Sequence, residues 1–202
     1  MIDTVKLMVN FPDFEITQPE LFYPDATQVL EMSRVSARAI QRPSKYDHQL
    51  GLYKPSLMLV KRPMEGGGIS IFLLIEFSAP KLLFGNNFEE CEESNFPLLI
   101  VKLTQALRAM GVVIHPKTLS CAKVLTIHYG KNYVLTDYSI PYSYMEEISR
   151  ANVSRIYDVN QSDFRNQGHG WKFRTNTFEF TLYNKVKDLE KANVSYKRAF
   201  ER

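Results

Sequence analysis

The strongest constraint on the fold is an apolar run that ends in an abrupt change of sequence pattern. The residues from Ile69 to Ile75 are almost all apolar and predict a buried strand. The block Glu76 to Phe88, which reads EFSAPKLLFGNNF, follows directly. Pro80 stops the ladder of backbone hydrogen bonds, and the Gly-Asn-Asn sequence at 85–87 tolerates left-handed backbone. This strand is therefore followed within about twelve residues by the Glu76 carboxylate, Pro80 and the turn at 85–87.

Hydrophobic periodicity predicts both strands and helices along the rest of the chain. We expect strands over Val5–Val9, Val35–Ile40, Leu57–Val60, Ile69–Phe77, Lys123–Tyr129 and Phe173–Tyr183, and helices over Asp25–Ser33, Ser94–Met110, Tyr142–Arg150 and Lys185–Glu201. The three glycines at 66–68 predict a hairpin turn rather than a phosphate loop, because a strand and not a helix follows them. The fold class predicted is α+β, with a central, mainly antiparallel sheet and helices packed on one face. We expect a single domain over residues 1–202.

The helix expected over Ser94–Met110 has the clearest pattern. Leu99, Leu103 and Leu107 fall on one face, which predicts that the helix packs against the sheet. Ser94 is a candidate N-cap, and Gly111 is expected to end the helix.

Composition limits the function only loosely. The chain has 25 Lys and Arg against 22 Asp and Glu, a net charge of +3, which permits a nucleic-acid partner without arguing for one. Two cysteines do not suggest a disulfide framework, and a reducing cytoplasm fits them. No apolar run approaches about 18 residues, so no membrane partner is expected.

Strand alternation predicts where polar chemistry could gather. Glu179, Thr181 and Tyr183 point to the face opposite Phe178, Phe180 and Leu182. On the strand over Lys123–Tyr129, Thr126 and His128 are expected opposite Leu125 and Ile127. If the two strands are neighbours, His128, Glu179 and Tyr183 converge on one polar surface.

Such a surface suits a DNA-nicking enzyme, although each residue also has a structural interpretation. His and carboxylate ligands can hold a divalent metal that polarises a phosphate, and a tyrosine hydroxyl can attack phosphorus. Lys185 and Lys187 could hold a phosphate beside the Tyr183 hydroxyl. Alternatively, His128 is a hydrogen-bonded structural residue, Glu179 is a solvated carboxylate, and Tyr183 is one of 11 tyrosines.

Three segments resemble one family, the gene II/X-type replication initiation proteins of filamentous phages and their plasmid relatives. They are the opening MIDTVKL, the block from Glu76 to Phe88, and the segment from Thr177 to Leu189. The His-Tyr-Gly-Lys-Asn sequence at 128–132 is also similar to a segment of that family. The resemblance implies a cytoplasmic protein of a bacterial host that nicks origin DNA, single- or double-stranded, to start rolling-circle replication. It also implies Mg²⁺ or Mn²⁺ as cofactor, and host helicase and polymerase as further partners.

The resemblance assigns roles to particular residues. Tyr183, with Lys185 and Lys187, becomes the candidate catalytic group, and His128, Glu179 and Glu76 become candidate metal ligands. The basic residues Lys131, Lys191, Lys197 and Arg198 become candidate DNA contacts, although acidic residues dilute the charge of the last helix.

Two departures from rolling-circle initiators in general keep other functions open. The chain lacks a His-hydrophobic-His pair, and Lys185 is at the wrong offset from Tyr183 for a Tyr-x-x-Lys motif. We expect a chain shortened at its C-terminus relative to the family. The alternative function is a non-catalytic, truncated DNA-binding regulator of replication, and a third is an α+β interaction protein.

Overall fold

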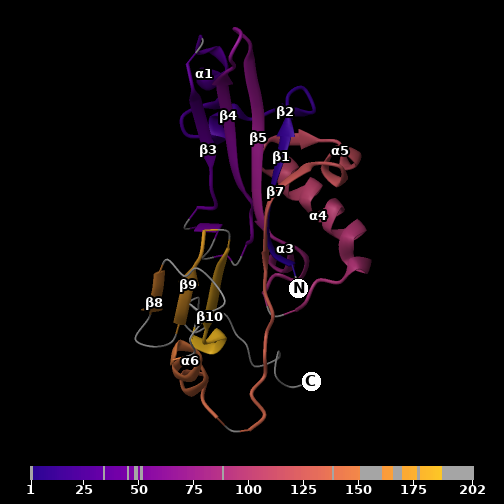
Figure 1. Ribbon diagram of the computed structural model, residues 1–202. Coiled ribbons are helices and arrows are strands. Elements are labelled where there is room, and N and C mark those ends of the chain that lie inside the picture. Colours follow the sequence, from indigo (N-terminus) through magenta and orange to yellow (C-terminus); the bar gives the residue numbers. More distant parts are fainter. Residues whose placement is uncertain are drawn as a thin grey trace. The chain divides into compact units, whose positions relative to one another are not determined.

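The structure is a computed structural model that describes residues 2–33, 35–44, 46–47, 50, 52–87, 89–137, 139–150, 161–165, 170–176 and 178–187. The chain divides into two compact units, Met1–Lys131 and Asn132–Arg202, which we describe separately (Figure 1). Both contain helices and strands, and the predicted α+β fold class is confirmed. That the chain acts as a single domain stays a prediction. Across the described ranges, no helix is both long and apolar enough to cross a membrane.

The larger unit is built on a five-stranded sheet in the order β3-β4-β5-β1-β7, with every neighbouring pair antiparallel. Its strands are β1 (Ile2–Asn10), β3 (Ala37–Gln41), β4 (Ser56–Pro63), β5 (Ile69–Ser78) and β7 (Lys123–Tyr129). The apolar run that opens β5 suits the central position, where a strand has neighbours on both sides. Three of the strands expected in one sheet, those over Val5–Val9, Ile69–Phe77 and Lys123–Tyr129, are therefore found there.

The glycine run forms the turn between β4 and β5. Gly66 and Gly67 have φ values of 100° and 93°, a region that side chains with a Cβ rarely adopt. The Met64 backbone N–H donates to the Gly68 carbonyl at 2.8 Å and closes the turn. The predicted hairpin is confirmed.

One face of this sheet carries the hydrophobic core, and helices cover it. Leu57, Leu59, Leu73 and Ile75 of β4 and β5 have no exposed surface. The covering elements are α1 (Ala26–Glu31), α4 (Phe96–Ala109) and α5 (Pro116–Ser120), together with a ribbon of β2 (Phe14–Ile16) and β6 (Val112–Ile114). Figure 1 shows α4 and α5 together on one side of the sheet. The expectation that the helix over 94–110 covers the apolar side is confirmed, because Leu103 and Leu107 belong to the core.

The ends of α4 differ in how well the sequence predicted them. A short 3₁₀ turn, η2 (Glu93–Asn95), precedes the helix, and Glu92 and Asn95 form its capping box, so the predicted Ser94 cap is wrong. Gly111 follows the helix with a φ of 71°, as expected. A Cβ at this position would lie 2.4 Å from the Cβ of Gln18, so the close approach of these two segments of the chain also requires glycine.

The block that follows β5 forms a helix that the sequence analysis did not predict. Its apolar residues lie in α3 (Ala79–Phe84), with Pro80 in the first turn, where a missing N–H costs no hydrogen bond. Leu82 and Leu83 are buried. Gly85, with a φ of 75°, ends the helix in the left-handed conformation that the Gly-Asn-Asn sequence predicted.

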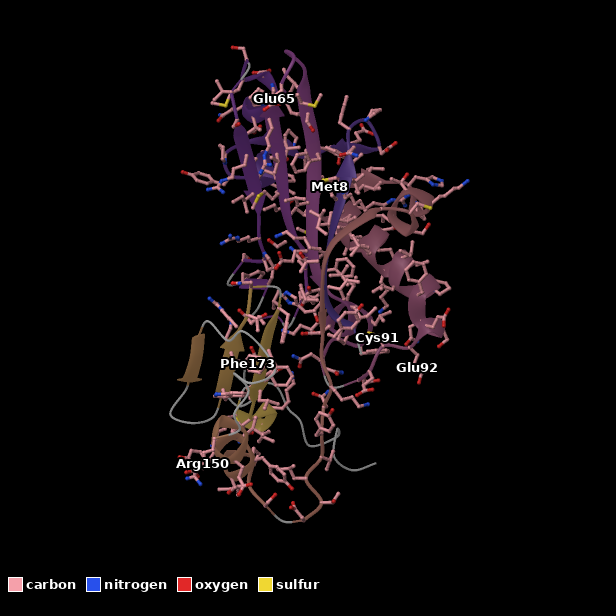
Figure 2. The ribbon with its side chains drawn as sticks, in the orientation of Figure 1. Met8, Glu65, Cys91, Glu92, Arg150 and Phe173 are labelled. Carbon is pink, nitrogen blue, oxygen red and sulfur yellow. The ribbon has the colours of Figure 1, made fainter. Side chains whose placement is uncertain are left out.

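The smaller unit contains a second, three-stranded antiparallel sheet in the order β10-β9-β8 and one helix. Its elements are α6 (Pro141–Arg150), β8 (Gln161–Arg165), β9 (Gly170–Arg174) and β10 (Glu179–Tyr183). Trp171 and Phe173 are buried, with ring centroids 5.1 Å apart, and Phe173 also contacts Phe180 (Phe173 is labelled in Figure 2). This unit therefore has an apolar cluster of its own.

The expectation of one strand over Phe173–Tyr183 in the central sheet is wrong. The segment forms a hairpin, in which the Thr175 backbone N–H donates to the Phe178 carbonyl at 2.9 Å. Thr175 and Asn176 interrupt the apolar pattern and favour a turn. Residues 185–187 are helical, and the remainder of the helix predicted over Lys185–Glu201 lies outside the described residues.

Candidate functional site

The sheet of the larger unit has a polar region on the face opposite the core. Lys6 of β1 lies across from Glu76 of β5 on one side and from Thr126 of β7 on the other. The Lys6 Nζ is 3.0 Å from a carboxylate oxygen of Glu76, and both side chains are about half-exposed. His128, opposite Thr4, is exposed on the same face. The predicted orientation of Thr126 and His128 away from the core is confirmed.

A register shift in β7 changes the other half of that prediction. The pairing slips between Lys6 and Leu7, so that Val124 lies across from Leu7. Leu125, which was expected to face the core, falls at this irregularity and is 43% exposed. Ile127 lies opposite the core residue Val5, so its predicted orientation toward the core is confirmed.

Glu76 and His128 share a face but are not adjacent. β1 lies between their strands, and His128 is two residues further along, so their Cα atoms are roughly 12 Å apart by ordinary strand geometry. Lys6 stands between them and neutralises Glu76. In this arrangement the Glu76 carboxylate is occupied by its ion pair with Lys6. Within the described ranges, no three His, Cys, Asp or Glu side chains come together as a metal-binding group.

A partly buried tyrosine that the sequence analysis did not identify fixes the end of β5. The Tyr53 hydroxyl accepts a hydrogen bond from the Ser78 backbone N–H, and the Ser78 hydroxyl lies 3.2 Å from a carboxylate oxygen of Asp3. Burial raises the pKa of Tyr53 to about 12, so this phenol stays protonated at neutral pH. These contacts hold the strand two residues beyond Glu76, and no sequence pattern around Tyr53 signals them.

In the smaller unit, alternation places Glu179, Thr181 and Tyr183 on one face of β10. Their partners across the hairpin are Arg174, Lys172 and Gly170. Glu179 forms ion pairs with Lys172 and with Arg174, the latter at 2.6 Å. The hydrogen bonds from these two cations, Lys172 first, lower the pKa of the Glu179 carboxyl below its usual value. Glu179 therefore stays ionised at neutral pH and is already held by positive charge.

Tyr183 ends β10 in a position that favours chemistry at its hydroxyl. Its partner across the hairpin, Gly170, has no side chain, and Tyr183 is 46% exposed. The Lys185 Nζ lies 3.2 Å from the Tyr183 hydroxyl and 5.3 Å from the ring centroid. A cation at this distance stabilises negative charge on the phenol oxygen or on a phosphate beside it. The backbone N–H of Lys187 is bonded to the side chain of Asn184 at 3.3 Å, which starts the helical turn at 185–187.

The predicted site residues therefore fall into two groups. Glu76 and His128 belong to the five-stranded sheet, whereas Glu179 and Tyr183 belong to the three-stranded one. The expectation that β7 and β10 belong to one central sheet is wrong, because the two strands lie in different sheets. The roles of these residues, including ligation of Mg²⁺ or Mn²⁺ by His128, Glu179 and Glu76, stay predictions.

The predicted DNA contacts are described only in part. Lys131 forms an ion pair with Glu90 at 2.9 Å, and both side chains are exposed. Lys191, Lys197 and Arg198 lie outside the described residues. Their contact with DNA stays a prediction.

Comparisons with protein-family models, with curated proteins and with solved structures found no match to this chain. The resemblance to phage replication initiators therefore rests on the sequence segments alone.

Proposed function

We propose that this protein is a replication initiator of a phage or plasmid, which nicks one strand of origin DNA through Tyr183. The observation that carries the proposal is the pairing of the hydroxyl of Tyr183, a residue that is 46% exposed, with the Lys185 ammonium at 3.2 Å. Lys172 and Arg174 outnumber the Glu179 carboxylate that they pair with on the same sheet face. A phosphodiester is an anion and fits such surroundings.

The proposed step is a transesterification at phosphorus. The Tyr183 oxygen forms a bond to phosphorus as the bond from phosphorus to the 3′ oxygen breaks. The phenol loses its proton, and the departing oxygen takes up a proton to become a 3′ hydroxyl. The DNA is left attached through its 5′ phosphate to the tyrosine, and a host polymerase can extend the free 3′ end. Lys185 stabilises the negative charge that develops during the exchange.

A covalent-adduct assay tests the proposal. The full chain is incubated with labelled single-stranded origin DNA in Mn²⁺, Mg²⁺ or EDTA, and labelled protein is detected after denaturing electrophoresis. We expect an adduct that disappears in Tyr183→Phe, which removes only the reacting oxygen. Tyr133→Phe is the matched control, because Tyr133 is 77% exposed and belongs to no proposed site. An adduct that survives in Tyr183→Phe would contradict the assignment.

Lys185→Gln separates the cation from the nucleophile. It keeps the tyrosine and removes the charge beside it. We expect adduct formation to slow by about a hundredfold, the usual cost of losing one preorganised charge-stabilising group.

The second candidate is a non-catalytic regulator that binds origin DNA. The ion pair of Glu76 favours it, because Lys6 neutralises this candidate metal ligand. Salt-sensitive DNA binding without any adduct, in the same assay, is the result that this alternative predicts.

A further inference from the structure

The face of the five-stranded sheet opposite the core, which we call the outer face, has an apolar strip across its middle. Residues opposite one another in the register share a face, and Ile40, Met58, Leu74 and Met8 form one continuous row over β3, β4, β5 and β1 (Met8 is labelled in Figure 2). All four side chains are half-buried rather than covered. The buried apolar residues of α1, α4 and α5 belong to the core on the other face.

Positive charge borders the strip. Lys123 lies across from Met8 and extends the row onto β7. One row away, Arg38 lies across from Val60, which lies across from Phe72. The strand positions of the outer face carry four cations, Lys6, Arg38, Arg62 and Lys123, against one described carboxylate, Glu76.

An aromatic ring and a guanidinium lie together beside this strip. The Arg62 guanidinium carbon is 5.7 Å from the ring centroid of Phe72. Aromatic rings and guanidinium planes are the groups on which unpaired bases stack. Among the described ion pairs, none neutralises Arg38, Arg62 or Lys123, whereas Lys6 is paired with Glu76.

We propose that the outer face is a track for single-stranded nucleic acid, with bases against Phe72 and the apolar strip and phosphates at Arg38, Arg62 and Lys123. A single strand presents apolar base faces and regularly spaced negative charge, and the outer face offers the complement of both. The inference rests on the proposed function and deepens it, because it places the bound strand on the larger unit. It requires neither Tyr183 nor a metal.

Fluorescence anisotropy of a labelled oligothymidine of about 20 nucleotides measures the binding. Arg38→Glu/Arg62→Glu reverses two charges of the outer face. Arg108→Glu/Lys117→Glu is the matched control, because these residues belong to α4 and α5 on the core side, are exposed, and give the same change in net charge. We expect the first pair to weaken binding at least roughly tenfold and the control less than about threefold.

Two milder variants keep the test valid if charge reversal disturbs the fold. Arg38→Gln/Arg62→Gln should reduce the slope of log affinity against log salt by about 1.4, since each phosphate contact to a single strand contributes about 0.7. Phe72→Leu, which keeps an apolar side chain, should weaken binding by about fivefold or more through loss of stacking. Unfolding midpoints by circular dichroism establish that each variant is folded.

The outcomes separate this inference from the proposed function. Equal loss of binding in both charge-reversed pairs, or an unchanged salt slope, overturns the outer-face track even if wild type forms the tyrosine adduct. Selective loss in Arg38→Glu/Arg62→Glu without any wild-type adduct supports the track and contradicts nicking. Wild type that binds no oligothymidine at low salt overturns the track, and the adduct assay with origin DNA decides the proposed function separately.

Discussion

In the larger unit the Glu76 carboxylate meets one lysine, Lys6, on a sheet face that also holds His128. In the smaller unit the Glu179 carboxylate meets two cations, Lys172 and Arg174, on a sheet face that ends in Tyr183. The same residue type thus stands in two electrostatic settings. The first face carries the donor types that a metal prefers, and the second carries a candidate nucleophile beside the Lys185 ammonium. We infer that cation-rich chemistry at phosphate belongs to the smaller unit, whereas the larger unit supplies surface for binding.

The largest effect that tests this division is the loss of a core side chain in one unit. Leu107→Ala should cost the larger unit about 2–5 kcal/mol, because Leu107 is fully buried and the substitution leaves a cavity. Trp171, the one tryptophan of the sequence, lies in the smaller unit. We therefore expect the unfolding midpoint measured by circular dichroism to fall in this variant. The midpoint measured by tryptophan fluorescence should change little. Coincident shifts of equal size would mean that the two units unfold together.

A smaller effect compares the two carboxylates directly. Glu179→Gln should lower the free energy of unfolding of the smaller unit by about 1 kcal/mol, because it weakens the ion pairs of one carboxylate with two cations. Glu76→Gln should cost the larger unit about half as much or less, since it weakens one. Denaturant titrations followed by fluorescence and circular dichroism measure the two values. The comparison fails if Glu76→Gln proves the more costly change.

The smallest effect concerns pH. Hydrogen bonds from Ser139 and from the Tyr144 hydroxyl, at 2.6 and 2.8 Å, lower the pKa of Asp137 to about 2. Because the folded pKa lies below the usual value of 3.8, the stabilisation is present above that value and is lost as the pH falls toward 2. The fluorescence melting midpoint should therefore fall on acidification, and fall less in Asp137→Asn. An identical pH dependence in that variant would show that Asp137 does not cause the loss of stability at low pH.

Local sequence signals predicted much of the fold and little of its long-range pairing. The glycine run predicted the hairpin, strand alternation predicted the orientation of His128, and Gly111 predicted the end of α4. Each of these features depends on residues that are neighbours in the sequence. The hairpin within 173–183 was missed because Phe178 and Phe180 continue the apolar pattern past the polar turn at Thr175 and Asn176. The helix α3 was missed because Pro80 reads as a stop, although proline is equally suited to a first helical turn.

The candidate site shows the same limit. Strand parity correctly placed Glu179 with Tyr183, and Thr126 with His128, on shared faces. Which strands pair across the chain depends on tertiary contacts, so sequence alone could not separate β7 from β10. The cations around Glu179 and the Tyr53 contact to Ser78 likewise come from residues distant in the sequence or across a turn.

The central claim is that Tyr183 forms a covalent bond to DNA, and mass spectrometry of the adduct tests it most directly. Trypsin is expected to release residues 175–185, TNTFEFTLYNK, in which Tyr183 is the only tyrosine. After the full chain has reacted with single-stranded origin DNA in Mn²⁺ and the DNA has been trimmed with nuclease, we predict a nucleotide phosphate on this peptide, fragmenting to Tyr183. A nucleotide phosphate on any other tyrosine peptide would contradict the account. So would DNA that binds the protein without any covalent attachment.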